Sequence, residues 1–242
     1  MIADLPHHIT ILFLLTVIGT LFGFQAATRS RTFLLIATGW IVLQSILALG
    51  DVYQDTAALP PRLILFGILP ALIAIAITLL VRSGKSFIGR IDLKRLTLFH
   101  AIRIPVEVVL ALLYHQGKVS VFMTFEGTNF DLFSGLTAPL VAYLAFRSSG
   151  RNDRLLIGWN ILCLLLLLNV VITAAFALPS PFQQLSFDQP NVAVLYFPFN
   201  LLPVFIVPTV LFAHLAAFRQ LARPADHARS GKAVPRPRGS LA

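Results

Sequence analysis

Residues 155–178 read LLIGWNILCLLLLLNVVITAAFAL and contain no charged side chain. An α-helix rises about 1.5 Å per residue, so a run of this length can cross the hydrocarbon core of a bilayer, which is about 30 Å thick. The run is therefore typical of a transmembrane helix, and it decides the class of fold.

The composition of the whole chain agrees with this interpretation. Of the 242 residues, 57% are apolar and 12% are charged, and the mean hydropathy is +0.83. A soluble domain keeps about a quarter of its residues charged, whereas here the charges form short clusters between long apolar runs. The sequence predicts an all-α, polytopic transmembrane helix bundle.

Seven apolar runs are candidates for membrane spans. They comprise residues 8–28, 33–50, 62–82, 97–116, 131–147, 155–178 and 193–218. The fourth contains charged residues, and the fifth is short and carries Pro139 inside it. A bundle of six spans with a re-entrant segment therefore stays open as an alternative.

Basic residues are distributed unevenly between these runs. Cytoplasmic loops retain Lys and Arg, whereas translocated loops lack them. One set of connections, together with the C-terminal tail, carries most of the basic residues: Arg29, Arg31, those of 82–95, those of 147–154 and those of 219–238. The bias predicts an N-terminus outside and a C-terminus in the cytoplasm.

The last segment, residues 222–242, differs from the predicted bundle of residues 1–221. It contains Pro224, Pro235 and Pro237, scattered basic residues and no apolar periodicity, which is typical of a disordered tail. Such a basic cytoplasmic tail favours contact with anionic lipid, although a simple topology anchor is an alternative. The net charge of +9 does not indicate a nucleic-acid partner, because no soluble basic module remains outside the apolar runs.

The polar residues of the fourth run share one helix face. His100, Arg103, Glu107 and Tyr114 are spaced by three, four and seven residues, and a helix turns about 100° per residue. Ionisable residues at membrane depth are functional candidates unless they form a structural ion pair that orients the helix. We expect this face to line a polar cavity in the bundle.

Arg103 and Glu107 are expected to share one charge network. Their i, i+4 order with the arginine first is the less favourable one, and Pro105 distorts the turn between them. Neighbouring spans must therefore contribute partners, for which Asn169 and Asn200 are the candidates.

Two outer loops, residues 122–131 and 181–191, mix aromatic residues with acids and amides. The aromatic residues fit interfacial anchors or a lid over the bundle. Glu126, Asp131 and Asp188 offer oxygen ligands to a hard cation, but their spacing matches no calcium loop.

Histidine and cysteine limit the metal chemistry. His100 and His214 are expected at similar depth in two spans and are the weak candidates for haem ligation. Cys163 is the one cysteine, so disulfides and thiolate metal clusters are excluded. No metal site is predicted beyond this, and the cofactor stays unassigned.

Two stretches resemble a group of uncharacterised bacterial seven-helix integral membrane proteins. They are MTFEGTNFDLFSGLTAP, residues 123–139, and PFQQLSFDQPNVAVLYFPFNLLPVFIVP, residues 181–208, followed by His214. The resemblance implies a bacterial inner-membrane location and carries no activity or substrate.

The leading hypothesis is a small-molecule or ion transporter or sensor with a polar cavity between the fourth, fifth and seventh spans. One rival is a membrane enzyme or a haem-binding electron-transfer protein. Another is a structural membrane subunit whose polar residues only orient its helices.

Overall fold

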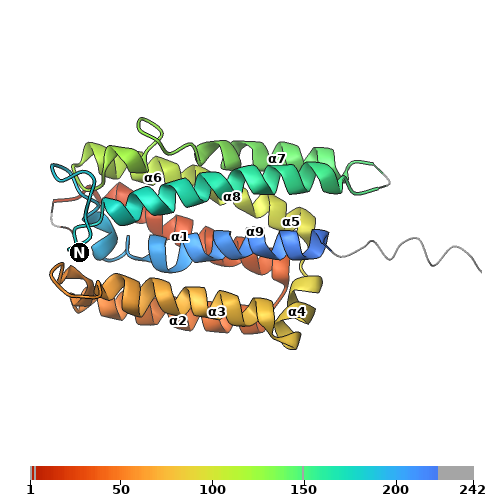
Figure 1. The fold of residues 1–242 in the computed structure, drawn as a ribbon, viewed down its shortest axis with the longest axis horizontal. Helices are drawn as coiled ribbons and strands as arrows, with labels where there is room; N and C mark the ends of the chain where they lie inside the picture. The colour runs from red at the N-terminus through yellow and green to blue at the C-terminus, as the bar shows by residue number, and fades with distance from the viewer. Residues whose placement is uncertain (1, 3, 149, 223–242) are drawn as a thin grey trace, which may run out of the picture.

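The computed structural model describes residues 2, 4–148 and 150–222, and in this part of the chain all regular structure is helical (Figure 1). The all-α prediction is thus confirmed. The predicted tail, apart from Ala222, lies outside the described residues. The main helices are α1 (His7–Thr28), α2 (Arg31–Leu49), α3 (Leu69–Leu80), α4 (Arg82–Gly89), α5 (Leu93–Phe99), α6 (Arg103–His115), α7 (Leu132–Phe146), α8 (Asp153–Phe176) and α9 (Val207–Leu221).

Short helices of other types complete the fold. Two five-residue π-helical segments, η2 (Ile64–Ile68) and η6 (Leu202–Ile206), lead directly into α3 and α9. One-turn 3-10 helices are η1 (Val52–Gln54), η3 (His100–Ile102), η4 (Val121–Met123) and η5 (Ala193–Leu195). Because η3 joins α5 to α6, residues 93–115 form one rod.

Within the described residues, five helices are long and apolar enough to cross a membrane: His7–Thr28, Arg31–Leu49, Leu93–His115, Asp153–Phe176 and Leu202–Leu221. A sixth candidate is Ile64–Leu80 with Arg82–Gly89, two helices bent by 84° at Val81. The fifth predicted run corresponds to α7, which has 15 residues and falls short of a full span. The helices agree with the predicted runs, but length and composition alone do not establish seven crossings.

The long helices run along one common axis (Figure 1). Helix α9 lies at the centre, since 67% of its most apolar window is buried, whereas only 17% of the α2 window is buried. Helices α6, α7 and α8 lie on one side of α9, and the pair α2 and α3 lies on the other.

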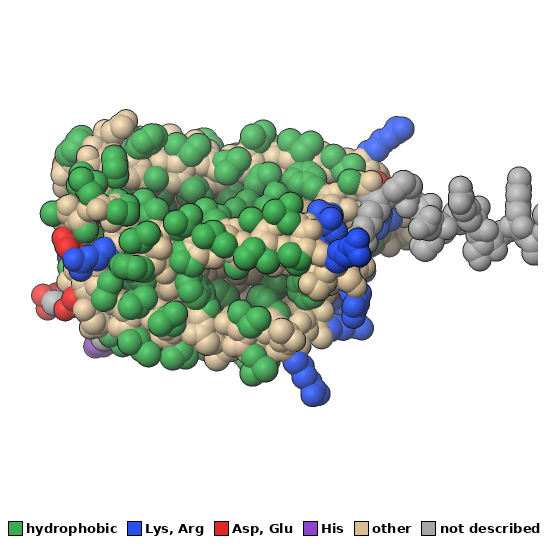
Figure 2. Space-filling view, turned by 60° about the horizontal axis from the view of Figure 1, so that its bottom comes forward, with side chains coloured by type: hydrophobic (Ala, Val, Ile, Leu, Met, Phe, Trp, Pro, Cys, Tyr) green, Lys and Arg blue, Asp and Glu red, His purple; other side chains and the backbone are tan. Residues whose placement is uncertain are grey.

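Apolar side chains cover the long faces of the molecule, and charged side chains gather at its ends (Figure 2). Most of the Lys and Arg side chains visible in this view lie at one end of the molecule. This distribution is the one expected of a helix bundle surrounded by hydrocarbon and bounded by two polar interfaces.

The predicted seventh span, 193–218, is not one continuous helix: its first residues form the separate 3-10 helix η5, and the continuous helical part begins just before η6. The preceding residues form the 3-10 turn η5 and a series of turns, in which Leu201 N–H donates to the Pro198 carbonyl. Pro198 and Pro203 lack the backbone donors that a continuous helix would need here.

Prolines at the π-helical segments are compensated by α2. Pro208 has no N–H for the Val204 carbonyl four residues earlier, and Trp40 Nε1 donates to that carbonyl at 2.9 Å. Pro70 likewise has no N–H for the Phe66 carbonyl four residues earlier, and Gln44 Nε2 donates to that carbonyl at 3.0 Å. Two side chains one helical turn apart on α2 thereby replace two missing backbone donors.

Gln44 also anchors the outer connection. Its Oε1 accepts the Tyr53 hydroxyl at 2.5 Å, and its backbone carbonyl accepts Asn200 Nδ2 at 3.0 Å. Burial raises the pKa of Tyr53 to about 12, which keeps this hydroxyl protonated and able to donate. The polar atoms of Gln44 thus tie together α2, η1, η2 and the start of the seventh span.

Candidate functional site

Arg103, the first residue of α6, lies at the centre of a buried polar network. It is ten residues from the start of its rod and twelve from the end, or about 15 and 18 Å along the axis. Its side chain is 3% exposed, and its Nη1 donates to Asp131 Oδ1 at 2.5 Å and to the Cys163 carbonyl at 3.3 Å. A buried arginine is thus paired with an acid at the start of α7.

The second guanidinium nitrogen reaches α9. Arg103 Nη2 lies 2.7 Å from His214 Nε2, and His214 Nδ1 lies 2.8 Å from Asn160 Oδ1. A guanidinium can only donate, so Nε2 of His214 must accept and the ring proton must be on Nδ1, which donates to Asn160. His214 is therefore neutral in this arrangement, and a proton added at Nε2 would displace Arg103.

The network continues on the acidic side through Asn129. The Asp131 backbone N–H donates to Asn129 Oδ1 at 2.9 Å, and Asn129 Nδ2 donates to Glu107 Oε1 at 2.5 Å. Ser134 Oγ donates to Asp131 Oδ1 at 3.3 Å. An unbroken series of polar contacts therefore runs from Glu107 through Asp131, Arg103 and His214 to Asn160.

Three buried polar atoms of this network have no hydrogen-bond partner among the described residues: His100 Nδ1, Arg103 Nε and Glu107 Oε2. The His100 ring stacks on that of His214, with centroids 4.1 Å apart. Buried polar groups are usually paired, so these three atoms mark where water or a small polar ligand can bind: Arg103 Nε can only donate a hydrogen bond, whereas Glu107 Oε2 can also accept a proton.

The local chain geometry explains why these groups meet. Helix α7 begins at the depth of Arg103, because the connection from α6 folds along the bundle before Asp131 (Figure 1). Gly135 permits the close approach of α7 and α6, since a Cβ there would lie 2.8 Å from Ile104 Cγ1 and 3.1 Å from Ile104 N. The small residue lets Asp131 reach Arg103.

The structure brings five of the predicted residues together, one of them Asp131 from the predicted outer loop, and separates others. His100, Arg103, Glu107 and the haem candidate His214 share the network, and Arg103 also interacts electrostatically with Glu107. Tyr114, the penultimate residue of α6, is half-buried beside His115 and takes no part in the network.

The two predicted asparagine partners are elsewhere. Asn169 is exposed and donates to the Thr128 carbonyl at 2.9 Å, and Asn200 belongs to the contacts of Gln44. Asn129 and Asn160 occupy the expected role instead. Asn160 could have been identified from the sequence, because it is a second asparagine in the same apolar run as Asn169. No sequence pattern identified Asn129 as a partner, because it lies in a loop whose path the sequence does not specify.

The three outer acids do not form one site. Asp131 is buried against Arg103, whereas Glu126 is exposed and pairs with His115 at 3.3 Å, and Asp188 is exposed. The placement of Asp131 with the outer loops is therefore corrected: it lies at mid-depth because α7 is short.

The histidine pair does not fit a haem. The two rings stack at an interplanar angle of 27°, and both nitrogens of His214 are already hydrogen-bonded, so the rings cannot approach a porphyrin iron from opposite faces. Among the described residues, no group of three or more His, Cys, Asp or Glu could hold a metal ion.

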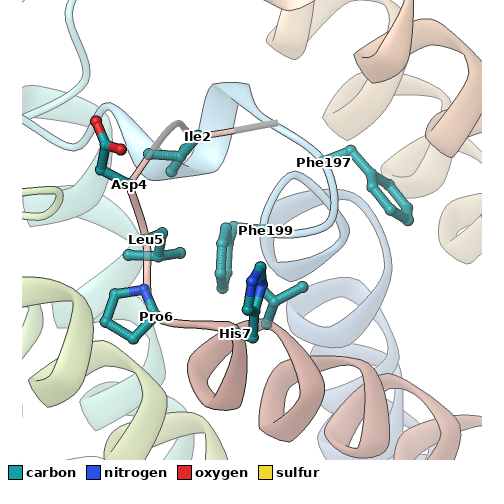
Figure 3. Close-up of a pocket in the computed structure, with 8 residues that line it drawn as sticks. Ile2, Asp4, Leu5, Pro6, His7, Phe197 and Phe199 are labelled. Carbon is teal, nitrogen blue, oxygen red and sulfur yellow. The ribbon is translucent and has the colours of Figure 1, made fainter.

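A separate pocket lies at the end of the bundle where α1 begins (Figure 3). It has a volume of about 490 Å³ and is lined by residues of the N-terminal segment and by Phe197 and Phe199. The Phe199 ring stands between Leu5 and His7, and the Asp4 carboxylate points away from it. None of the predicted site residues lines this pocket.

Comparison with known proteins gives one match. A family model described as a domain of unknown function, DUF8737, matches residues 60–222, which include the complete network from His100 to His214. No curated protein and no solved structure matches the chain. The chain belongs to this family of proteins with the DUF8737 domain of unknown function.

Proposed function

We propose that this protein handles a small molecule or ion in a membrane by binding a proton at the network of Glu107, Asp131, Arg103 and His214. The observation that carries the proposal is the unbroken series of polar contacts at mid-depth in the bundle, with three buried polar atoms that lack described partners. Proton-coupled transporters and membrane sensors both need such an ionisable site away from bulk water.

The charges of the network favour proton exchange. One guanidinium faces two carboxylates, so a proton on Glu107 would leave the Arg103–Asp131 pair neutral overall. A proton on His214 would instead place two cations 2.7 Å apart and break the contact between α6 and α9. Protonation of His214 therefore releases the contact between α6 and α9, whereas protonation of Glu107 leaves the Arg103–Asp131 pair in place.

Infrared difference spectroscopy of the full-length protein in lipid, titrated from alkaline to mildly acidic pH, tests this proposal. We expect a carboxylic C=O band to appear during the titration and to be lost in Glu107→Gln. In His214→Leu the titration should shift, because Arg103 loses one of its acceptors.

Glu126→Gln is the matched control, since Glu126 is an exposed carboxylate outside the network. This variant should retain the buried band of the wild type. If the titration of Glu107→Gln matched that of the wild type in a folded protein, the network would not be the proton site and the proposal would be abandoned.

We further propose seven crossings, with the N-terminus outside and the C-terminus inside the inner membrane of a bacterium. Support comes from the Lys and Arg bias between the apolar runs, and from the common direction of the long helices (Figure 1). In this proposal the bent pair α3–α4 and the short α7 each count as one crossing.

A further inference from the structure

A lateral apolar groove is bounded by α2, α3 and the segment η6–α9. It has a volume of about 770 Å³, within the range of ligand sites, and α4 closes it at one end. Ile36 and Trp40 of α2, Ala74 of α3 and Phe212 of α9 are among its lining residues. The space-filling view looks onto this side of the molecule, where the surface is hollowed between apolar side chains (Figure 2).

Small residues keep the groove open. Gly39 lines it, and a Cβ built there would meet no atom within 4 Å. Ala71 and Ala74 line the facing side on α3. Larger side chains at these positions would fill the space, so the groove is a product of the sequence at this helix pair.

The end of the groove beside α4 is polar and basic. Ser30, Thr32 and Ser83 line it, and the exposed Arg31 and Arg82 are their immediate chain neighbours. The 84° bend between α3 and α4 places the basic segment across this end. An apolar groove with basic residues at one end matches an anionic amphiphile. A hydrocarbon chain would occupy the groove, and a negative headgroup would bind the arginines.

We infer that this groove holds one acyl chain of an anionic membrane phospholipid, with the headgroup at Arg31 and Arg82. The inference is independent of the proton site, because no residue of the network lines the groove.

The charge distribution favours a lipid over a second copy of this chain. A copy inserted in the same orientation would bring its own basic end against Arg31 and Arg82. The acids described at that end, Asp92 and Asp153, are already paired with Arg95 and Arg151. An anionic headgroup supplies the charge that the copy lacks.

Trp40 lines the groove and can report its occupant. The chain has two tryptophans, so Trp159→Phe leaves Trp40 as the only one. This protein would be reconstituted into phosphatidylcholine vesicles containing a minor fraction of brominated phosphatidylglycerol or, separately, the same fraction of brominated phosphatidylcholine. We expect the anionic brominated lipid to quench Trp40 more strongly.

Two changes should remove this preference by different routes. Gly39→Leu fills the groove, so quenching by both lipids should fall to the level produced by bulk lipid. Replacing Arg31 and Arg82 by Gln leaves the groove but weakens headgroup binding, by about fivefold for each arginine. The two brominated lipids should then quench alike.

Matched control variants exist on α8 and its connection to α7. Gly158 is exposed with open space around its Cβ, so Gly158→Leu adds the same bulk away from the groove. Arg147→Gln with Arg154→Gln removes two basic residues from another part of the basic end. Both variants should quench as the parent protein does.

Equal quenching of Trp40 by the two brominated lipids in the Trp159→Phe protein would overturn the inference. Stronger quenching by the anionic lipid that persists after Gly39→Leu would also overturn it. Lipid mass spectrometry of protein purified in mild detergent gives a second readout that does not need the Trp159 change. The wild-type protein should carry more bound phosphatidylglycerol than the Gly39→Leu variant does. If light scattering instead showed a dimer that Gly39→Leu dissociates, with no lipid preference, the occupant would be a second copy.

Discussion

Arg103 is the residue on which the network depends, because its guanidinium touches groups from α7, α8 and α9 at once. An unpaired charge at this depth would be costly. Removing one partner of a buried ion pair therefore destabilises a protein more than removing both partners. The energetic question at this scale is therefore which carboxylate compensates Arg103.

We predict that Arg103 is coupled to Asp131 more strongly than to Glu107. Arg103→Gln and Asp131→Asn should each destabilise the protein by about 3–5 kcal/mol, because each leaves a buried charge unpaired, and the double variant should recover much of this loss. Thermal unfolding of the two single variants and the double variant gives the coupling as a double-mutant cycle.

The cycle of Arg103→Gln with Glu107→Gln should show a smaller coupling, because Glu107 has its own donor in Asn129. The exposed pair of Arg151 and Asp153 serves as the control and should couple by about 0–1 kcal/mol. Additive effects of Arg103 and Asp131 would mean that each is hydrated separately, which would contradict the network.

Sequence patterns identified part of this site. A helical period was enough to place His100, Arg103 and Glu107 on one buried face, since charge inside an apolar run is a strong signal. Asp131 is the first residue of the fifth predicted run and the last of the predicted outer loop 122–131, so the sequence placed it at the end of a span, and its contact with Arg103 spans 28 residues. Long-range pairs of this kind depend on where a short helix begins, which no local pattern encodes.

At the scale of helices, the apolar runs predicted the long elements because hydrocarbon requires continuous hydrogen-bonded backbone. The helix α4 was not predicted, since its eight residues are too few and too polar to resemble a span. Neither were the π-helical segments, in which the Phe66 and Val204 carbonyls accept hydrogen bonds from side chains of α2.

We predict that the donors of α2 and the prolines of η2 and η6 are energetically coupled. Trp40→Phe keeps the ring but removes the donor to the Val204 carbonyl, which should cost about 1–3 kcal/mol. Pro208→Ala supplies a backbone N–H four residues after Val204, so Trp40→Phe with Pro208→Ala should regain stability over Trp40→Phe alone. Thermal unfolding in detergent measures both.

Gln44→Leu with Pro70→Ala repeats this comparison at the Phe66 carbonyl. The mixed pair, Trp40→Phe with Pro70→Ala, is the control and should not show the same rescue, because Pro70 affects a different carbonyl. Equal rescue by either proline change would show that the prolines act through general helix stability.

For the molecule as a whole, the proposed topology makes its two ends chemically distinct. In a Cys163→Ala background, single cysteines at the exposed positions Ala57 and Gln184 should react with an impermeant maleimide added outside intact cells. Cysteines at the exposed Lys94 and Ser148 should react only after the membrane is opened.

Labelling of all four positions from one side, or of Lys94 from outside, would contradict the seven-span arrangement. Reaction at Ser148 from outside together with protection of Gln184, while Lys94 stays protected, would instead identify α7 as re-entrant and favour six spans. The two arrangements thus differ at two labelled positions, because a re-entrant α7 also reverses the direction in which the following helix, α8, crosses.

The separation of Arg103 from Asp131 also has a consequence for biosynthesis. The ribosome adds about 5–20 residues per second, so the 28 residues between them leave the arginine without its acid for some seconds after it emerges. During that interval the α5–α6 rod carries an uncompensated cation that resists transfer into lipid. The insertion machinery would therefore retain the α5–α6 rod until α7 has been synthesised, and α6 and α7 would enter the bilayer together as one unit.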